Sequence, residues 1–235
     1  MTVAVDMRTR NNAGARTLLI GRTGAVALIL SAVIAQLVTS VTFWSERGAH
    51  DLGRNIITYL SFFTVESNIL AAALLTALLV AQLGRLRLGR RFDVLLLGAT
   101  AYMVLTGAVY NATMRDVALP ASASLEWANE VLHVVAPAWM LLDWIISSRE
   151  RRLRWRDLGT VAVFPALWLG CTLLRAPRTP EEAIGNPYWY PQLDPASYET
   201  GAFGVVTTCL GITVALLLIT GALLAHAAWR ARMHA

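Results

Sequence analysis

The chain has 235 residues, of which 56% are hydrophobic and 15% are charged, and its formal net charge is +5. A mean hydropathy of +0.53 excludes an ordinary soluble domain. All the cationic side chains other than histidine are arginines, and without a lysine amine the chain cannot form a retinal-type or pyridoxal Schiff base. The positive charge requires no nucleic-acid partner, because anionic lipid headgroups account for it.

Long apolar segments recur along the chain, and about 20 apolar residues suffice to cross a bilayer core as a helix. We predict an all-α polytopic membrane protein: one bundle of six transmembrane helices that fills residues 24–228. A basic arm at 1–23 precedes it, without a signal-peptide cleavage pattern, and a short tail follows at 229–235. The expected spans lie near 24–44, 58–83, 93–114, 127–147, 158–175 and 203–228.

The arginines are distributed unequally between alternate connections. One side carries Arg8, Arg10, Arg16, Arg22, Arg85, Arg87, Arg90, Arg91, Arg149, Arg151, Arg152, Arg154, Arg156, Arg230 and Arg232. The other side carries only Arg47, Arg54, Arg115, Arg175 and Arg178. Positively charged connections stay in the cytoplasm, so we expect both termini to be cytoplasmic. Arginine without lysine, together with abundant alanine, is typical of a GC-rich bacterial genome and favours a bacterial plasma membrane.

The outer connection at 176–202 is rich in proline and aromatic residues. Tyr188, Trp189 and Tyr190 follow one another there. Two readings stay open: a lid that contacts substrate over the bundle, or an aromatic belt at the headgroup level. Cys171 and Cys209 lie near the outer ends of the last two spans, either as small packing residues or as a disulfide pair.

Polar side chains gather at one depth on three of the predicted spans. They are Thr64, Ser67 and Asn68 on the second span, Tyr110 and Asn111 on the third, and Glu130 and His133 on the fourth. Polar groups in lipid are costly unless they meet one another or a ligand. Thr64 and His133 each lie six residues inside their spans, which places both at a depth of roughly 9 Å. The sequence therefore predicts a shared polar site below the outer surface.

Each of these residues also has a structural interpretation. A threonine in a membrane helix commonly bonds the carbonyl four residues earlier, and asparagine or histidine commonly joins two helices. Glu130 is also explained by a position near the outer headgroups. Glu66 is expected to point away from Thr64, while Asp143 lies about 15 Å from His133 and is a candidate cap for the arginine-rich connection.

Taken together, the set has the composition of a hydrolytic site. A threonine becomes a nucleophile beside a histidine base, and a carboxylate such as Glu130 can orient that base. Asparagine amides and the Tyr110 hydroxyl are candidate oxyanion donors. Pro137 removes the helical hydrogen bond to the carbonyl of His133, so we expect the fourth span to open locally there. Gly107 leaves room for close packing beside Tyr110 and Asn111.

Two segments carry a family resemblance: Phe62-Phe63-Thr64-Val65-Glu66-Ser67-Asn68 and Leu132-His133-Val134-Val135-Ala136-Pro137. Together they resemble the integral-membrane androgen-induced protein family, which includes the androgen-dependent regulator of tissue factor pathway inhibitor, and the bacterial six-span proteins grouped beside it. The resemblance implies hydrolysis of fatty acid esters of hydroxy fatty acids, with Thr64 as nucleophile, His133 as its partner and no cofactor.

Two other functional classes remain as alternatives. A small-solute or proton-coupled transporter would use Glu66, His133 and Asp143 within the bilayer. A scaffold or binding protein would have no turnover. A haem or metal centre is not expected, because His50, His226 and His234 are predicted to lie far from His133.

Overall fold

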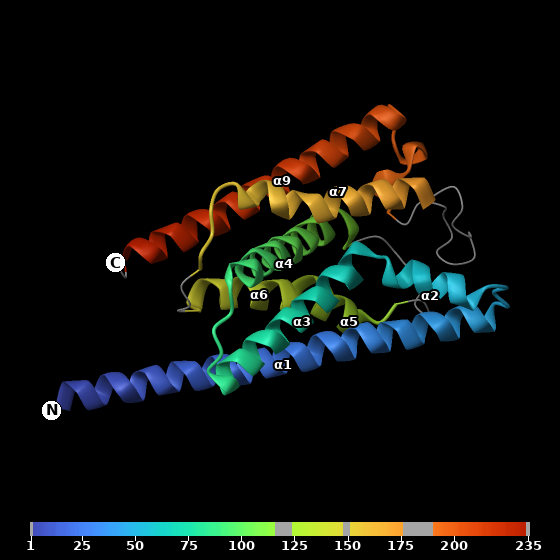
Figure 1. The fold of residues 1–235 in the computed structure, drawn as a ribbon. Coiled ribbons are helices and arrows are strands. Elements are labelled where there is room, and N and C mark those ends of the chain that lie inside the picture. The colour runs from blue at the N-terminus through green and yellow to red at the C-terminus, as the bar shows by residue number, and fades with distance from the viewer. Residues whose placement is uncertain (1, 116–123, 148–150, 176–189, 234–235) are drawn as a thin grey trace.

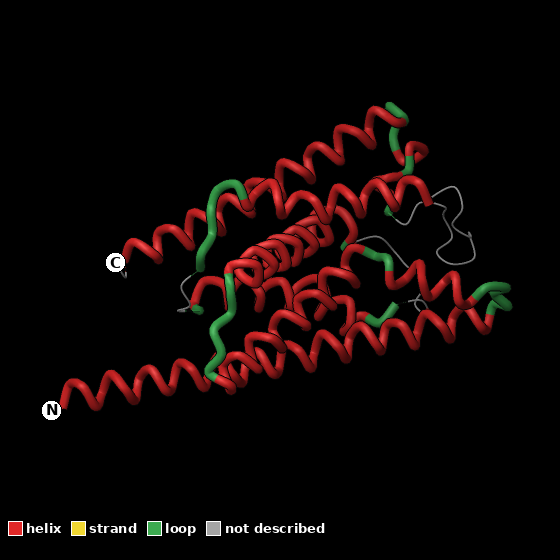
Figure 2. The backbone as a smooth tube through the Cα atoms, in the orientation of Figure 1, coloured by secondary structure: helices red, strands yellow, loops and turns green. Residues whose placement is uncertain are grey.

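The computed structural model describes residues 2–115, 124–147, 151–175 and 190–233. Within these ranges the chain is helical, with no strand (Figure 2). The long helices are α1 (Thr2–Glu46), α3 (Phe63–Gly84), α4 (Arg90–Val109), α7 (Asp157–Arg175) and α9 (Ala202–Met233). The shorter elements are α2 (Leu52–Leu60), α5 (Glu126–Glu130), α6 (Ala136–Ile146), the π-helical turns η1 (Tyr110–Met114) and η2 (Val131–Val135), and the 3₁₀ turns η4 (Pro191–Leu193) and η5 (Pro195–Ser197).

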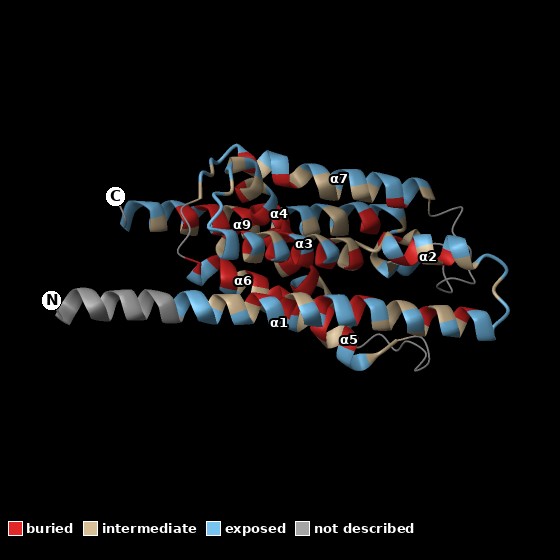
Figure 3. Ribbon diagram, turned by 60° about the horizontal axis from the view of Figure 1, so that its bottom comes forward, coloured by how far each residue is buried: buried red, intermediate tan, exposed pale blue. Residues whose placement is uncertain are grey.

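The long helices form one elongated bundle around α4. Figure 1 shows α1 along one side and α7 and α9 along the opposite side, with both chain ends at the same end of the bundle. The central helix α4 packs against α3, α6, α7 and α9. Its Leu97, Ala99, Ala101 and Met103 are completely buried, and buried residues concentrate in this central layer (Figure 3). Small side chains on α4 allow its neighbours to approach closely.

Five helical segments in the described ranges are long and apolar enough to cross a membrane. They are Gly14–Glu46, Phe63–Gly84, Arg90–Met114, Asp157–Arg175 and Ala202–Met233. The all-α membrane architecture predicted from the sequence agrees with this. Helix α1 begins at Thr2, so the basic arm predicted at 1–23 forms the first part of α1 and is not a separate segment before it. Helix α9 ends at Met233, five residues past the predicted end of the last span at 228.

The fourth predicted span, 127–147, is not among those five. It corresponds to α5, η2 and α6, which follow one another without a gap from Glu126 to Ile146. The ionisable residues Glu126, Glu130, His133 and Asp143 lower its apolar character. A sixth span, like the cytoplasmic location of the termini, stays a prediction.

The second predicted span, 58–83, contains a break that the hydrophobic pattern does not reveal. Helix α2 ends at Leu60, and Phe62 has an extended backbone with φ −65° and ψ 133° before α3 begins at Phe63. Thr64 therefore lies in the first turn of a new helix, and not six residues inside a continuous one. The first backbone N–H groups of a helix have no partner within that helix, so this position places Thr64 beside hydrogen-bond donors.

The local opening predicted beside Pro137 is present as the π-helical turn η2. The amide of Ala136 bonds the carbonyl of Val131, and a second π-helical turn, η1, lies at the end of α4. A Cβ atom added at Gly107 would lie 2.9 Å from the carbonyl oxygen of His133 and 3.1 Å from Cβ of Pro137. Glycine is therefore required where α4 meets the opened turn.

The arm and the fourth segment are joined by a buried ion pair. Nε of Arg22 on α1 lies 2.7 Å from Oδ1 of Asp143 on α6, and the two side chains are 6% and 3% exposed. Nη1 of Arg22 also donates to Gln82 on α3 at 3.0 Å. The carboxylate of Asp143 therefore binds α1, and residues 148–150 of the connection that it was expected to cap lie outside the described residues. Cys171 and Cys209 are both free thiols, so the structure has no disulfide between them.

Candidate functional site

Thr64 and His133 lie within hydrogen-bond reach of each other. Oγ1 of Thr64 is 3.3 Å from Nε2 of His133, although 69 residues separate them in the chain. Thr23, Thr76, Thr100 and Thr220 show the usual arrangement, in which each hydroxyl donates to the carbonyl four residues earlier. The Thr64 hydroxyl instead faces an imidazole, so the predicted meeting of Thr64 and His133 is present although the depth was counted along a helix that is broken at Phe62.

The second ring nitrogen of His133 determines which tautomer is present. Nδ1 lies 3.0 Å from the carbonyl oxygen of Asn129, one turn earlier on the same segment. A carbonyl oxygen only accepts hydrogen bonds, so in the neutral ring Nδ1 carries the proton and donates it. Nε2 then presents its lone pair to Thr64, which is the arrangement that a general base requires.

The expectation that Glu130 orients His133 was wrong. Glu130 pairs with Arg115, with Oε1 2.9 Å from Nη2, and the two side chains are 47% and 42% exposed. Residue 130 follows Asn129 by one position, so its side chain projects from a different part of the helical turn. The backbone of Asn129 takes the orienting position instead.

Tyr110 supports the imidazole of His133 by stacking, and its predicted role as an oxyanion donor stays a prediction. Its ring lies parallel to His133, with centroids 4.0 Å apart and an interplanar angle of 24°. Nδ2 of Asn129 donates to the Tyr110 hydroxyl at 2.6 Å. Tyr110 begins η1 and His133 lies within η2, so two π-helical turns meet at the base. Such turns are frequent at functional sites.

Ser67 and Asn68 position the segment that carries Thr64. Both are completely buried. Oγ of Ser67 donates to the Thr64 carbonyl at 3.1 Å, and Nδ2 of Asn68 donates to the same carbonyl at 2.8 Å and to that of Leu132 at 3.2 Å. The Asn68 amide thus joins α3 to η2 directly beside the Thr64–His133 contact. Its donors bind backbone carbonyls, which excludes the predicted oxyanion role in this arrangement.

Asn111 plays a similar part on the other side of His133. Its Nδ2 donates to the Gly107 carbonyl at 2.7 Å and lies 3.5 Å from the carbonyl of His133, which Pro137 leaves without a helical donor. Its Oδ1 accepts from Nε of Arg115 at 2.8 Å. Asn111 therefore connects the two π-helical turns through main-chain oxygen atoms.

Tyr190 reaches the site from the outer connection. Its hydroxyl accepts the backbone N–H of Phe63 at 3.1 Å and lies beside Thr64. Burial raises the pKa of Tyr190 to about 12, and hydrogen bonds with Thr64 and with nearby backbone amides partly oppose that rise. The ring packs edge-on against Trp168 and Phe62, with centroid distances of 5.5 and 6.1 Å. Tyr190 is thus a neutral phenol that covers the start of α3.

Tyr188 and Trp189, the other two residues predicted to contact substrate, lie outside the described residues. The part of the aromatic segment that the structure describes is Tyr190, and its contacts favour a covering role over a headgroup belt.

A shallow apolar groove of about 310 Å³ runs between α4 and the η2–α6 segment. Its lining residues are Val104, Gly107, Ala108, Asn111, His133, Val134, Pro137, Ala138 and Leu141. The groove reaches His133, and neither Thr64 nor any other residue of α3 lines it. An acyl chain in this groove would therefore pass next to the base.

The remaining carboxylates of the transporter alternative do not join this site. Asp143 is neutralised by Arg22, as described above. Glu66 lies near Arg175 and Tyr190, and its Oε2 is buried without a hydrogen-bond partner among the described residues. Glu66 therefore lies near Arg175 and Tyr190 at the start of α3.

The sequence interpretation missed Asn129 and Arg115. Asn129 precedes His133 by four residues, a spacing that places both on one helical face, so this signal was available. Arg115 was counted in the sequence only as one of the positive charges of an outer connection.

In the described part of the chain, no group of three or more His, Cys, Asp or Glu side chains is arranged to hold a metal ion. Comparisons with family models, curated proteins and solved structures found no match to the chain.

Proposed function

We propose that this protein is a membrane-embedded lipid ester hydrolase with Thr64 as nucleophile and His133 as general base. The observation that carries the proposal is the 3.3 Å contact between Oγ1 of Thr64 and Nε2 of His133, with Nδ1 held on the carbonyl of Asn129. A hydroxyl, an acceptor nitrogen and a group that orients the ring are the three parts of an activated oxygen nucleophile.

In the proposed reaction, the Thr64 hydroxyl passes its proton to Nε2 while its oxygen attacks the ester carbonyl. The tetrahedral intermediate collapses when His133 returns that proton to the departing alcohol, which leaves an acyl ester on Thr64. A water molecule, activated by the same nitrogen, then releases the fatty acid and regenerates the hydroxyl. The Tyr190 hydroxyl and the first N–H groups of α3 are the donors nearest to the developing oxyanion.

The substrate class is proposed to be long-chain acyl esters, and fatty acid esters of hydroxy fatty acids in particular. The apolar groove beside His133 supports an acyl substrate that enters sideways from the bilayer. The resemblance of the Thr64 and His133 segments to the androgen-induced protein family supports the narrower choice of ester.

The test is hydrolysis of a fatty acid ester of a hydroxy fatty acid by the purified full chain. Thr64→Ala is expected to reduce turnover to background, and His133→Ala to reduce it by about 10²–10⁴-fold. Thr64→Ser keeps a hydroxyl and should retain measurable turnover. Thr76→Ala is the matched control, because the Thr76 hydroxyl bonds only its own helix among the contacts described. Full turnover by folded Thr64→Ala would overturn the proposal.

Labelling with a fluorophosphonate separates the three functional classes. A hydrolase should be labelled at Thr64, and the His133→Ala variant should lose the label. A proton-coupled transporter would remain unlabelled and would show pH-driven uptake in proteoliposomes, while a scaffold would show neither. The pairing of Asp143 with Arg22 weighs against the transporter, because a neutralised carboxylate is a poor carrier of protons.

A further inference from the structure

A second cavity, of about 310 Å³, lies at the end of the bundle that holds both chain termini. One wall comes from the connection before α7 and the other from α9. The lining residues are Arg151, Leu153, Arg154, Trp155, Leu224, Ala227, Ala228 and Ala231. The cavity is thus distant from Thr64 at the start of α3, and its occupant is independent of the proposed hydrolysis.

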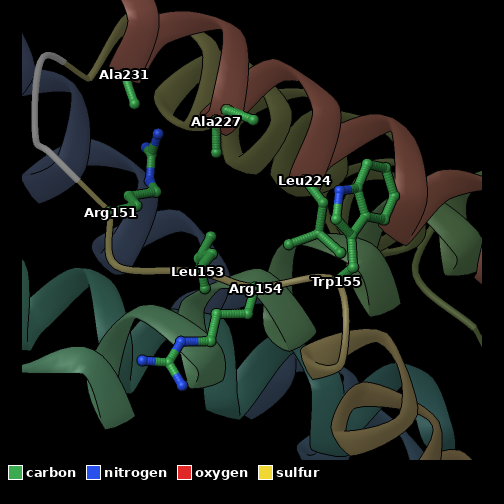
Figure 4. A pocket seen from close by; sticks show the side chains of 8 residues that line it. Arg151, Leu153, Arg154, Trp155, Leu224, Ala227 and Ala231 are labelled. Atoms are coloured by element: carbon green, nitrogen blue, oxygen red, sulfur yellow. The ribbon is translucent and has the colours of Figure 1, made fainter. Parts of the chain in front are cut away.

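Arg151 gives the cavity a fixed positive charge. Figure 4 shows its side chain rising toward α9 near Ala231, whereas the guanidinium of Arg154 points away from α9. Nη2 of Arg151 donates to the Trp144 carbonyl at 3.0 Å, and its Cζ lies 3.9 Å from the centroid of the Trp144 ring. This anchoring orders the guanidinium before any ligand arrives, which reduces the entropy that binding costs. None of the described residues lining the cavity is acidic.

The connection that forms the first wall is held by buried carboxylates. The backbone N–H of Arg152 donates to Asp93 at 3.2 Å, and that of Arg154 donates to Asp157 at 2.8 Å. Asp93 and Asp157 are 1% and 2% exposed, and Asp157 also pairs with Arg90. The wall is therefore tied to α4 and α7, so the cavity has a defined shape.

Apart from Arg151 and Arg154, the lining is apolar and continues onto the surface of α9. Leu224 and Ala227 are buried, and the Trp155 ring lies close to Gly221. Trp155 and Trp229 are 63% and 55% exposed at this same end of the bundle. Tryptophan in such positions is typical of the level of lipid headgroups. A ligand in this cavity would contact the guanidinium of Arg151 at one end and apolar side chains of α9 along the rest of its length.

We propose that this cavity binds one anionic phospholipid, with its phosphate on Arg151 and its acyl chains along the apolar surface of α9. Planar guanidinium groups match the oxygen atoms of a phosphate. A free phosphate would leave the apolar lining without a partner, and a nucleic acid would require an extended basic surface instead of a small, mostly apolar cavity. The uneven charge of the chain, with arginine gathered at this end, favours an anionic headgroup over a zwitterionic one.

The experiment measures lipid retained by the purified full chain with native mass spectrometry, after reconstitution with phosphatidylglycerol or with phosphatidylcholine. We expect one phosphatidylglycerol molecule per chain to be retained preferentially. Arg151→Gln should weaken that retention about tenfold, as expected for loss of a charge-assisted hydrogen bond. Arg156→Gln is the matched control, since it removes the same charge from an exposed residue of the same connection outside the cavity.

A second variant guards against misfolding of Arg151→Gln, which also loses its contacts with Trp144. Ala231→Trp keeps the arginine and fills the cavity from α9, so it should also reduce retention while the melting temperature is unchanged. Equal loss in the Arg151 and Arg156 variants, or equal retention of the two lipids, would overturn the proposal. Displacement of the lipid by millimolar inorganic phosphate would also overturn it, because the site would then recognise the free anion alone.

Discussion

The carbonyl oxygen of Asn129 lies 3.0 Å from Nδ1 of His133, in the position where the sequence had suggested the carboxylate of Glu130. A neutral carbonyl orients the ring without adding a negative charge beside it. The proposed base is therefore held by main chain, and no single side-chain substitution removes the group that orients it.

The first prediction concerns Glu130. Glu130→Gln should change ester turnover by about twofold or less, because its carboxylate binds Arg115 at an exposed position. Turnover by the purified variant is the measurement. A fall of a hundredfold or more would mean that Glu130 does orient the base, since that is the scale of general-base catalysis.

The second prediction concerns Asn68, whose buried amide joins α3 to η2. Asn68→Ala should lower the free energy of unfolding by about 1–3 kcal/mol, because the buried carbonyl of Leu132 and the part-buried carbonyl of Thr64 each lose a donor. It should also reduce turnover, because Thr64 and His133 are no longer held together. Thermal unfolding in detergent and ester turnover are measured on the same preparation.

Thr76→Ala is the control for Asn68, since it removes a hydrogen bond within α3 that does not reach another segment. If Asn68→Ala and Thr76→Ala unfold at the same temperature, the connection between α3 and η2 carries no special stability.

The third prediction concerns the buried pair of Arg22 and Asp143. Asp143→Ala should destabilise the protein by about 3–5 kcal/mol, because it leaves a guanidinium that is 6% exposed without its counter-charge. The double variant Arg22→Leu/Asp143→Leu should recover much of that loss, because no buried charge is left unpaired. Chemical denaturation of the single and double variants measures the coupling. Additive effects would show that the two charges do not depend on each other.

The fourth prediction concerns Tyr190 and alkaline pH. The pKa of its phenol is about 12 in the folded protein, against an ordinary value of 10.0. Between these values the unfolded chain loses the proton while the folded chain keeps it, so stability should fall as pH rises from about 10 to 12. Tyr190→Phe keeps the ring packing but has no proton to lose, so its melting temperature should fall less steeply over that range.

The same variant tests the hydroxyl in catalysis at neutral pH. Tyr190→Phe should lower turnover about 10²–10³-fold if the phenol stabilises the oxyanion, since the loss of one such donor costs on this scale. Unchanged turnover would leave Tyr190 as a packing residue that covers the start of α3.

Several features were accessible from the sequence alone. Apolar length predicted the helical membrane architecture, and spacing predicted that Thr64, Ser67 and Asn68 share one helical face. Pro137 predicted the opening of the helix beside His133. These properties depend on residues close together in the chain, where helical geometry applies directly.

The partners of the polar side chains were not accessible in this way. The break at Phe62, the pairing of Arg22 with Asp143 and the arrival of Tyr190 at Phe63 all depend on how separate helices pack. The contacts of Arg22 with Asp143 and of Tyr190 with Phe63 join residues that are more than a hundred positions apart. Several side chains of similar chemistry could have been the partner of each of these residues.

The sequence by itself thus determined which residue types lie inside an apolar helical bundle, because the cost of exposing or burying each side chain is a local property. Only the tertiary structure decided that His133 faces Thr64 through Nε2 and Asn129 through Nδ1, while Glu130 turns to Arg115. The reason is that hydrogen bonds require positions accurate to a fraction of an ångström, and such accuracy comes from the packing of α3, α4 and η2 together.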